Sequence, residues 1–392
     1  MRHSLLIVLI LSMAIVSFGI KVNVIHQWKY IDYEWESQEQ KEDAINSGTY
    51  NPYKNFLNGV DRANDGRVFV TVSKYLNTGV PATLATVTNK TGPGGPLLRP
   101  YPDWSWHNNS SMCDGIINVY KLHIRCNHIF VLDNGQIGSC QICKPKLLIF
   151  NLKNDTLVKT IYIPFTIVAN QTDYGLLVKP VVYVPGKCER LLDEMIIFMA
   201  DTGGYGLVVY DSSTERMCRV ESDYMKPTDI YFSIAHTNFT YVGGIYSMTI
   251  LEEQLFYAPV SGKEIYKIKI KTLLKCPNKK EANKQTQLVQ KLSSQTVDIT
   301  SAKYSIFYSD TMGLSILGTN VCKKSGENTV LLAQDKEKFQ SVSSMTASSY
   351  WDKLICMSDR FQRLYTLNLK EINFRHFEME LSEILKEMDQ SE

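Results

Sequence analysis

The sequence lacks a hydrophobic run long enough to cross a membrane, an excess of charge of one sign, and helical patterning over most of its length. Its one long apolar stretch, Leu5 to Val16, is shorter than the roughly 18 to 20 residues that span a bilayer. Lys and Arg total 42 against 40 Asp and Glu, so no basic footprint for nucleic acid or a membrane surface is present. We therefore expect no membrane-spanning helix, no membrane partner and no nucleic-acid partner.

Motifs for common enzyme chemistry are also missing. The chain has no Gly-x-Ser-x-Gly segment, and its seven histidines show no paired spacing. His123 and His128 flank Cys126, but this arrangement lacks a zinc-site signature. We accordingly predict a protein that is not an enzyme and that uses no cofactor and no metal.

The N-terminus and the glycosylation motifs predict a secreted protein. Arg2 and His3 precede the apolar stretch, and small residues follow it at Ser17 and Gly19. This pattern is typical of a secretory signal peptide, which we place at residues 1–19. Six Asn-x-Ser/Thr motifs permit glycosylation of a secreted surface, at Asn89, Asn108, Asn109, Asn154, Asn170 and Asn238.

Nine cysteines in a secreted chain favour disulfides, and their odd number leaves at least one without an internal partner. Cys140 and Cys143 have the C-x-x-C spacing of redox motifs, but no thioredoxin-like βαβ pattern surrounds them. We therefore expect Cys113 to pair with one of the two.

Short segments rich in β-branched and aromatic residues recur along the chain, most of them followed by a turn and a second strand. Aligning the polar residue that ends each apolar segment gives Ser73, Asp133, Asp201, Glu252, Asp310 and Asp359. The intervals are 60, 68, 51, 58 and 49 residues, which suits one four-stranded propeller blade per unit. An immunoglobulin-type sandwich repeats at roughly 100 residues and has a Cys and Trp spacing that is missing here.

This repeat predicts an all-β fold, a six-bladed β-propeller over residues 20–376. The one convincing helical pattern lies in the acidic tail, 377–392, where Phe377, Leu381, Ile384 and Leu385 fall near helical spacing. Closing the ring requires a strand to complete the last blade, a role that Val22 to Trp28 can fill. The inner strands then surround a channel, and the ligand site is expected at its mouth.

Several segments, in order, resemble the Yellow and major royal jelly protein family. The strongest are Gly79-Val80-Pro81-Ala82-Thr83-Leu84 and Pro100-Tyr101-Pro102-Asp103-Trp104, and Val131-Leu132-Asp133-Asn134-Gly135 follows them. Within the family the chain looks most like salivary Yellow-related proteins of blood-feeding sand flies. That resemblance implies a monomeric salivary protein that sequesters serotonin, noradrenaline, adrenaline, dopamine and histamine in the channel.

The same resemblance implies two disulfides, Cys126–Cys188 and Cys276–Cys322. Cys218 stands where the family has a Trp in a Trp-Arg-Ile type segment. We therefore expect Cys218 to be an unpaired, buried thiol.

The resemblance to salivary members also implies a ligand site formed by Thr346, Asp359 and Phe361. A carboxylate beside the channel attracts an ammonium group more strongly than in bulk water. Phe361 adds stacking or cation–π attraction, and Thr346 accepts a hydrogen bond from the amine. From the residues alone, a turn-forming role is favoured for Asp359, as it is for Asp133, Asp201 and Asp310, and a core position is favoured for Phe361.

Two other functions remain open at this stage. Some Yellow relatives are associated with dopachrome conversion, and other six-bladed propellers bind calcium in the channel and hydrolyse lactones. Carboxylates at Asp133, Asp201, Glu252, Asp310 and Asp359 are the oxygen ligands that a calcium site would need. A structural or nutritive protein with an empty channel is the third possibility.

Overall fold

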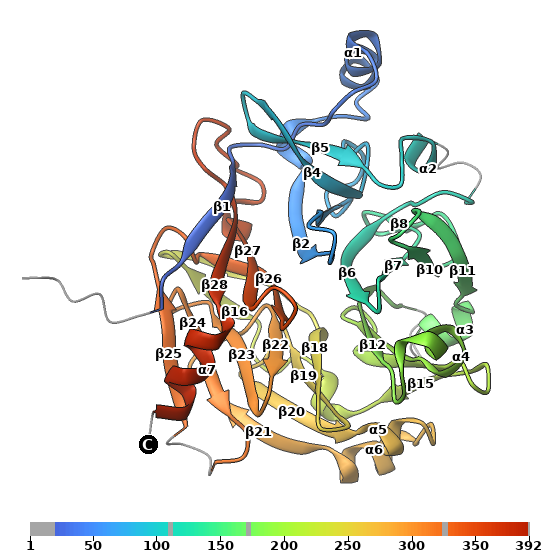
Figure 1. Ribbon diagram of the computed structural model, residues 1–392, viewed down its shortest axis with the longest axis vertical. Helices are drawn as coiled ribbons and strands as arrows, with labels where there is room; N and C mark the ends of the chain where they lie inside the picture. The colour runs from blue at the N-terminus through green and yellow to red at the C-terminus, as the bar shows by residue number, and fades with distance from the viewer. Residues whose placement is uncertain (1–19, 109–112, 170–173, 324–327, 391–392) are drawn as a thin grey trace, which may run out of the picture.

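The computed structural model describes residues 20–108, 113–169, 174–323 and 328–390, so the predicted signal peptide lies outside the described residues. Six four-stranded antiparallel sheets form a ring, which is a six-bladed β-propeller (Figure 1). The predicted fold class is confirmed. Two additional two-stranded hairpins are inserted between strands of the ring.

The blades follow one another along the chain, and each is built from four strands. Blade one contains β2 (Phe56–Arg62), β3 (Val68–Ser73), β4 (Leu84–Gly92) and β5 (Gly95–Pro100). Blade two contains β6 (Val119–Arg125), β7 (His128–Asp133), β10 (Lys146–Asn151) and β11 (Thr156–Tyr162). Blade three contains β12 (Leu177–Tyr183), β13 (Ile196–Asp201), β14 (Gly206–Asp211) and β15 (Arg216–Glu221).

The second half of the ring repeats this plan. Blade four contains β18 (Ile245–Leu251), β19 (Gln254–Pro259), β20 (Glu264–Lys269) and β21 (Gln287–Lys291). Blade five contains β22 (Ile299–Ala302), β23 (Ser305–Asp310), β24 (Ser315–Asn320) and β25 (Thr329–Gln334). Blade six contains β26 (Ser341–Ser348), β27 (Lys353–Asp359), β28 (Phe374–Glu380) and the N-terminal β1 (Asn23–Trp28).

The N-terminal strand closes the ring, as predicted. β1 pairs antiparallel with β28, so that Trp28 lies opposite Phe374 and His26 opposite His376. This pairing satisfies an edge that would otherwise expose backbone hydrogen-bonding groups. Trp28 is fully buried and its indole nitrogen donates to the Pro96 carbonyl at 2.7 Å, which ties blade six to blade one.

The first strand of each blade is the innermost one. β2, β6, β12, β18, β22 and β26 contact their neighbours in that order around the ring. The second strands are almost entirely apolar and buried, with Phe69, Phe130 and Phe198 fully enclosed. Because side chains alternate between the two faces of a strand, both faces of these sheets pack against adjacent blades. Each such aromatic or aliphatic side chain contributes about 1.5 to 3 kcal/mol by leaving water.

The repeat alignment is correct for five blades and wrong for the fourth. Ser73, Asp133, Asp201, Asp310 and Asp359 each end the second strand of a blade. Glu252 instead lies in the turn between β18 and β19 with a positive φ of 49°, one strand too early. The equivalent position is Pro259, which ends β19. The apolar segment around Tyr246 belongs to the innermost strand, which is as hydrophobic as its neighbour.

Short helices and two hairpins connect the strands. The hairpins are β8 (Gln136–Ile137) with β9 (Cys140–Gln141), and β16 (Tyr231–Ile234) with β17 (Thr237–Thr240). The helices are α1 (Gln38–Asn46), α2 (Ser105–Asn108), α3 (Phe165–Val168), α4 (Leu191–Glu194), α5 (Ile270–Leu273), α6 (Lys279–Gln285) and α7 (Leu381–Gln390). No described helix is long and apolar enough to span a membrane.

Helix α1 was not anticipated, although its start has a sequence signature. Ser37 caps the helix by accepting a hydrogen bond from the Gln40 amide at 3.0 Å. A Ser followed three residues later by Gln is the pattern of a capping box. The helix has only one buried residue, Ala44, and therefore shows little hydrophobic periodicity.

The C-terminal helix exists, but it begins later than predicted. β28 continues to Glu380, four residues beyond the expected boundary at 376, and Phe377 lies within the strand. Leu381, Ile384, Leu385 and Met388 are buried on one side of α7, which contacts β24 and β25 (Figure 1). The helix also contacts β27 and β28, so the tail packs against blades five and six rather than extending away from them.

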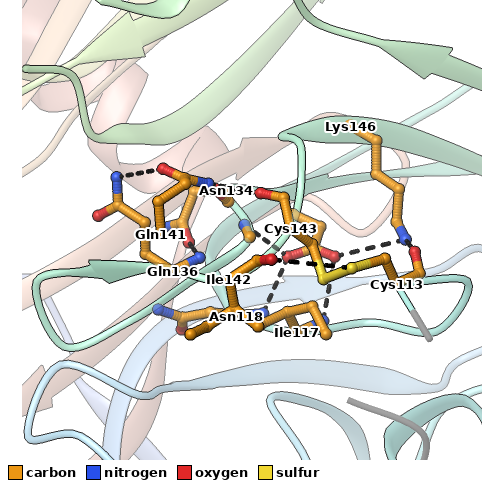
Figure 2. The surroundings of a disulfide bond; sticks show 11 residues. Cys113, Ile117, Asn118, Asn134, Gln136, Gln141, Ile142, Cys143 and Lys146 are labelled. Carbon is orange, nitrogen blue, oxygen red and sulfur yellow. Dashed lines mark hydrogen bonds and ion pairs between the residues drawn. A yellow bond between two sulfur atoms is a disulfide. The ribbon is translucent and has the colours of Figure 1, made fainter. Parts of the chain in front are cut away.

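Two of the predicted cysteine pairings are confirmed. Cys126 is bonded to Cys188, with 5.4 Å between their Cα atoms. Cys113 is bonded to Cys143 rather than to Cys140, which is exposed and free. Figure 2 shows this second disulfide joining the segment before β6 to the segment after β9, with Lys146 beside Cys113.

The predicted Cys276–Cys322 pair is wrong, and so is the assignment of Cys218 as a free thiol. Cys218 on β15 is bonded to Cys276, with 6.0 Å between their Cα atoms. The reason is that α6, just after Cys276, packs against β15 of the preceding blade. Cys322 follows β24 in blade five and is exposed, while the third free cysteine, Cys356, is buried in β27.

Three of the predicted glycosylation motifs present their asparagine on the surface. Asn89, Asn154 and Asn238 are exposed. The side chain of Asn108 and the whole of Asn109 and Asn170 lie outside the described residues.

Candidate ligand-binding site

A pocket opens at the mouth of the channel, on the side where the innermost strands begin. It contains about 670 Å³ of empty space, including its open mouth. Five blades contribute to it, together with the β16–β17 hairpin that is inserted between blades three and four. Its walls are mainly aromatic and include Tyr75, Tyr120, Phe232, Phe239, Tyr246 and Phe361. We call it the channel pocket.

The β16–β17 hairpin supplies one aromatic wall of the pocket. Phe361, which follows β27 of blade six, packs against this wall. Phe232 and Phe239 lie directly opposite one another in the hairpin, and their rings stack with centroids 5.3 Å apart. Phe361 contacts Phe239 at 5.9 Å and Tyr241 edge-on at 5.6 Å. These ring contacts fix the position of this wall of the pocket.

Among the described residues, the one carboxylate that lines this pocket is Asp359, at the end of β27. Only 4% of the residue is exposed. The Phe361 amide donates to its Oδ1 at 2.9 Å, and the hydroxyl groups of Ser341 and Ser343 lie beside it. Burial raises the pKa of Asp359 to about 6, although these hydrogen-bonding groups and the charge of Lys121 oppose the rise. Near pH 7 most of the population carries a negative charge that no described cation pairs within 4 Å.

The turn-forming role considered for the blade-end aspartates is present in all four. The Oδ1 atom accepts a backbone amide from Gly135 at Asp133, from Gly204 at Asp201, and from Gly313 at Asp310, as it does from Phe361 at Asp359. What separates Asp359 from the others is that it also faces a pocket. Its turn role therefore does not prevent its side chain from facing the pocket.

Thr346 does not line the channel pocket. In β26 it is Ser341 that pairs with Asp359, whereas Thr346 pairs with Ile355. Five residues along a strand correspond to about 17 Å at roughly 3.3 Å per residue, so Thr346 lies toward the opposite end of the channel. The residues of β26 that line the channel pocket are Ser341 and Ser343.

Among the hydroxyl groups that line the pocket is that of Ser73, which the sequence analysis used only as a blade marker. Ser73 ends β3, lines the pocket and is 1% exposed. Within the described residues its Oγ atom has no hydrogen-bond partner. A buried hydroxyl without a partner is unfavourable by about 1 to 3 kcal/mol, so a ligand that supplies one gains affinity.

Below the pocket, buried charges close the channel. Asp298 accepts from Lys121 at 3.1 Å and from Lys179 at 2.6 Å, and all three side chains are almost fully enclosed. Two cations thus share one anion. Burial lowers the pKa of Lys121 to about 8, against the attraction of Asp298. The channel is therefore a blind pocket at this depth rather than an open tube.

The carboxylates considered for a calcium site do not assemble into one. Among the described residues, no group of three or more His, Cys, Asp or Glu side chains is placed to hold a metal ion. Asp201 pairs with Arg219 at 2.8 Å, and Asp310 accepts from Ser293 and Ser294. His123 accepts the Val182 amide at 2.9 Å, and burial lowers its pKa to about 3.

Comparison with known proteins places this architecture in a family. The family model described as "Major royal jelly protein" matches residues 117–389, more than half of the chain. The chain belongs to the major royal jelly protein family. Major royal jelly protein 8 of Apis mellifera is 30% identical over 93% of this chain and 92% of its own length. Major royal jelly protein 5 of the same species is 35% identical over 83% of this chain and 54% of its own length.

Solved structures with similar backbones are more distant from this royal jelly family member. A luciferin-regenerating enzyme matches 92% of this chain and 95% of its own length, with a TM-score of 0.49 and 8% sequence identity.

Proposed function

We propose that this family member is a binding protein for biogenic amines, which it sequesters in the channel pocket without turning them over. The observation that carries the proposal is the single buried carboxylate of Asp359 within an otherwise aromatic pocket. An isolated anion in such surroundings favours a cationic ligand, because little solvent screens the attraction. The aromatic walls favour a ligand whose remaining surface is a flat ring.

Serotonin and the catecholamines carry three groups that match three features of the pocket. The ammonium group pairs with Asp359, and the ring lies among Phe361, Phe239 and their neighbours. A ring hydroxyl meets the unpartnered Oγ atom of Ser73. Histamine lacks the hydroxyl and the larger ring, so we expect it to bind more weakly than serotonin.

The energetics require all three features together. A cation–π contact contributes about 0.5 to 2 kcal/mol, and nanomolar affinity requires about 12 kcal/mol. Burying a ring contributes roughly 25 cal/mol for each Å² of apolar surface removed from water. Because the aromatic walls already contact one another, little of this free energy is lost in ordering the pocket.

The proposal extends to where the protein acts. Three disulfides are typical of an oxidising, extracellular environment, and the predicted signal peptide agrees with secretion. We propose a monomer secreted in saliva, as the resemblance to salivary Yellow-related proteins implies. Removing serotonin, noradrenaline, adrenaline, dopamine or histamine at a bite would oppose vasoconstriction, platelet activation and inflammation.

The test is calorimetric titration of the secreted protein with these five amines. We expect one binding site per chain, and at least about tenfold weaker binding after Asp359→Asn. Thr346→Val is the matched control in the same blade, and its affinity should equal that of the original protein. If no amine binds, or if Asp359→Asn binds as tightly as the original, the proposed function is wrong and a nutritive role becomes the better explanation.

A second titration tests how the ligand is oriented. Serotonin and tryptamine share the indole ring and the ammonium group and differ by one ring hydroxyl. Ser73→Ala should weaken serotonin binding by about threefold to tenfold, corresponding to the loss of one hydrogen bond. Tryptamine binding should not change. Equal losses for both ligands would contradict the placement of the hydroxyl at Ser73.

A further inference from the structure

A second pocket lies beside the channel pocket and shares a strand with it. Ser73 and Tyr75 line the channel pocket, whereas Lys74, between them, lines the second one. Alternate side chains of an extended segment point to opposite sides, which explains the division. We call this second hollow the lateral pocket. It contains about 1300 Å³ of empty space, part of it open to solvent.

The lateral pocket is built from segments that the amine site does not use. α1 forms one side, and the two segments that most resemble the royal jelly family, around Gly79-Val80-Pro81 and Trp104, form another. The rings of Trp35 and Trp104 stack with centroids 4.9 Å apart. The disulfide Cys113–Cys143 braces the β8–β9 hairpin, which supplies Ile137.

Lys74 is the feature of this pocket that the fold does not explain. Only 7% of the residue is exposed. Within the described part of the chain, its ammonium group has no hydrogen bond and no ion pair. The other two buried lysines are paired: Lys121 with Asp298, and Lys146 with Asp133 at 3.9 Å. The Nζ atom of Lys74 is not among the fully enclosed polar atoms, and Lys74 lines the lateral pocket, so a ligand in this pocket can reach the ammonium group.

The backbone around Lys74 holds it in place. Its amide donates to the Asn118 side chain at 2.8 Å, and its carbonyl accepts from the Gly138 amide at 2.9 Å. Asp133 is near enough to attract the Lys74 ammonium electrostatically, but its carboxylate oxygens already accept hydrogen bonds from the Ile117 and Asn118 amides. The backbone of Lys74 is thus held by hydrogen bonds, and its ammonium group is available to bind a ligand in the pocket.

We propose that the lateral pocket binds a small organic monocarboxylate, with Lys74 as the partner of the carboxylate and the tryptophan-lined wall as the contact for the apolar part. The charged groups that line the pocket favour a ligand with a single negative charge. His107, also in the lining, is neutral near pH 7 because burial lowers its pKa to about 4. Asp43 at the rim repels a second negative charge, and a phosphate group would need more than one cation.

The experiment is calorimetric titration of the full secreted protein with acetate, benzoate, indole-3-acetate and inorganic phosphate. We expect benzoate and indole-3-acetate to bind, and binding to weaken by about tenfold or more in Lys74→Met. Lys153→Met, at an exposed turn between β10 and β11, makes the same change in net charge and should bind like the original protein. Lys74→Arg keeps the charge and should retain part of the affinity.

A labelling measurement covers the case in which Lys74→Met does not fold. The original protein is treated with formaldehyde and a borohydride reductant with and without benzoate, and the peptide that contains Lys74 is analysed by mass spectrometry. Benzoate should protect Lys74 and leave Lys153 unprotected. The proposal is overturned if no carboxylate binds at up to about 10 mM, if only phosphate binds, if Lys74→Met folds and binds as well as the original, or if benzoate fails to protect Lys74.

Discussion

Asp201 and Asp359 occupy the same position in two blades, at the end of the second strand, and yet their carboxylates have different surroundings. Asp201 accepts the Leu176 and Gly204 amides with Oδ1 and pairs with Arg219 through Oδ2. Asp359 accepts the Phe361 amide with Oδ1 and meets only neutral hydroxyl groups besides. Burial raises the pKa of both carboxyls, but only Asp201 has an arginine within 4 Å to oppose it.

The comparison shows that the same residue type at the same blade position differs in its available charge, because one aspartate has a cationic partner and the other does not. At Asp201 the charge is neutralised by the chain, so the residue stabilises a turn and a blade. At Asp359 the negative charge is not neutralised by an ion pair. This lowers the stability of the folded protein at pH 7, and the carboxylate faces the channel pocket. Groups kept in unfavourable surroundings are characteristic of functional sites.

The largest expected effect is at the blade-three position. Asp201→Asn places an amide NH₂ group against Arg219 and removes the negative charge of a buried pair. We expect the free energy of unfolding to fall by about 3 to 5 kcal/mol, measured by denaturant unfolding at pH 7. Amine binding per folded molecule should be unchanged. A loss below about 1 kcal/mol would mean that Glu221, also paired with Arg219, replaces Asp201 fully.

The matched change at blade six should have the opposite sign. The pKa of Asp359 is raised from 3.8 to about 6, so ionisation at pH 7 destabilises the folded state by up to about 3 kcal/mol. Asp359→Asn keeps the acceptor for the Phe361 amide and removes this penalty. The unliganded variant should therefore be more stable at pH 7, and the difference should vanish below about pH 4, where the carboxyl is protonated in both the folded and the unfolded state. A variant less stable than the original at pH 7 would show that the charge is compensated.

The smallest effect concerns the pH dependence of amine binding. As the pH falls through about 6, Asp359 takes up a proton, and binding of the cation should weaken by up to about tenfold for each further pH unit. Lys121, with a pKa of about 8, remains charged and His123, with a pKa of about 3, remains neutral over this range. Titrations between pH 7 and pH 5 test this, and Asp359→Asn should show no such dependence. A flat profile in the original protein would exclude Asp359 as the partner of the ammonium group.

Much of the fold could be predicted because each blade repeats the same pattern of strands and turns. A buried apolar strand followed by a polar turn residue recurs in the sequence, and the alternation of side chains defines it without reference to other blades. The prediction was wrong at Glu252, where two adjacent strands are equally apolar and local pattern cannot rank them. The acidic tail was recognised, but Phe377 fits both a buried strand and a helix.

The candidate site was harder to predict because its residues do not repeat. Asp359 and Phe361 lie at and just after the end of a recognisable strand, whereas Phe232 and Phe239 come from the hairpin inserted between blades three and four. Thr346 lies at the other end of β26 from the residue that pairs with Asp359. The sequence does not reveal this, because the register of β26 is set by its pairing with β27. The pairing of Cys218 with Cys276 depends on helix α6 packing against a neighbouring blade, which spacing in the sequence does not reveal.

By itself, the sequence determined the six blades, the closing strand and the identity of the blade-end residue in five of the six blades, because these follow from local alternation and turn chemistry. Only the tertiary structure decided which of those residues keeps an uncompensated charge. Burial, ion pairing and the distance to a neighbouring blade are properties of residues far apart in the chain. Arg219 neutralises Asp201, whereas no described cation lies within 4 Å of Asp359, and Lys74 lines a pocket together with two tryptophans and a histidine.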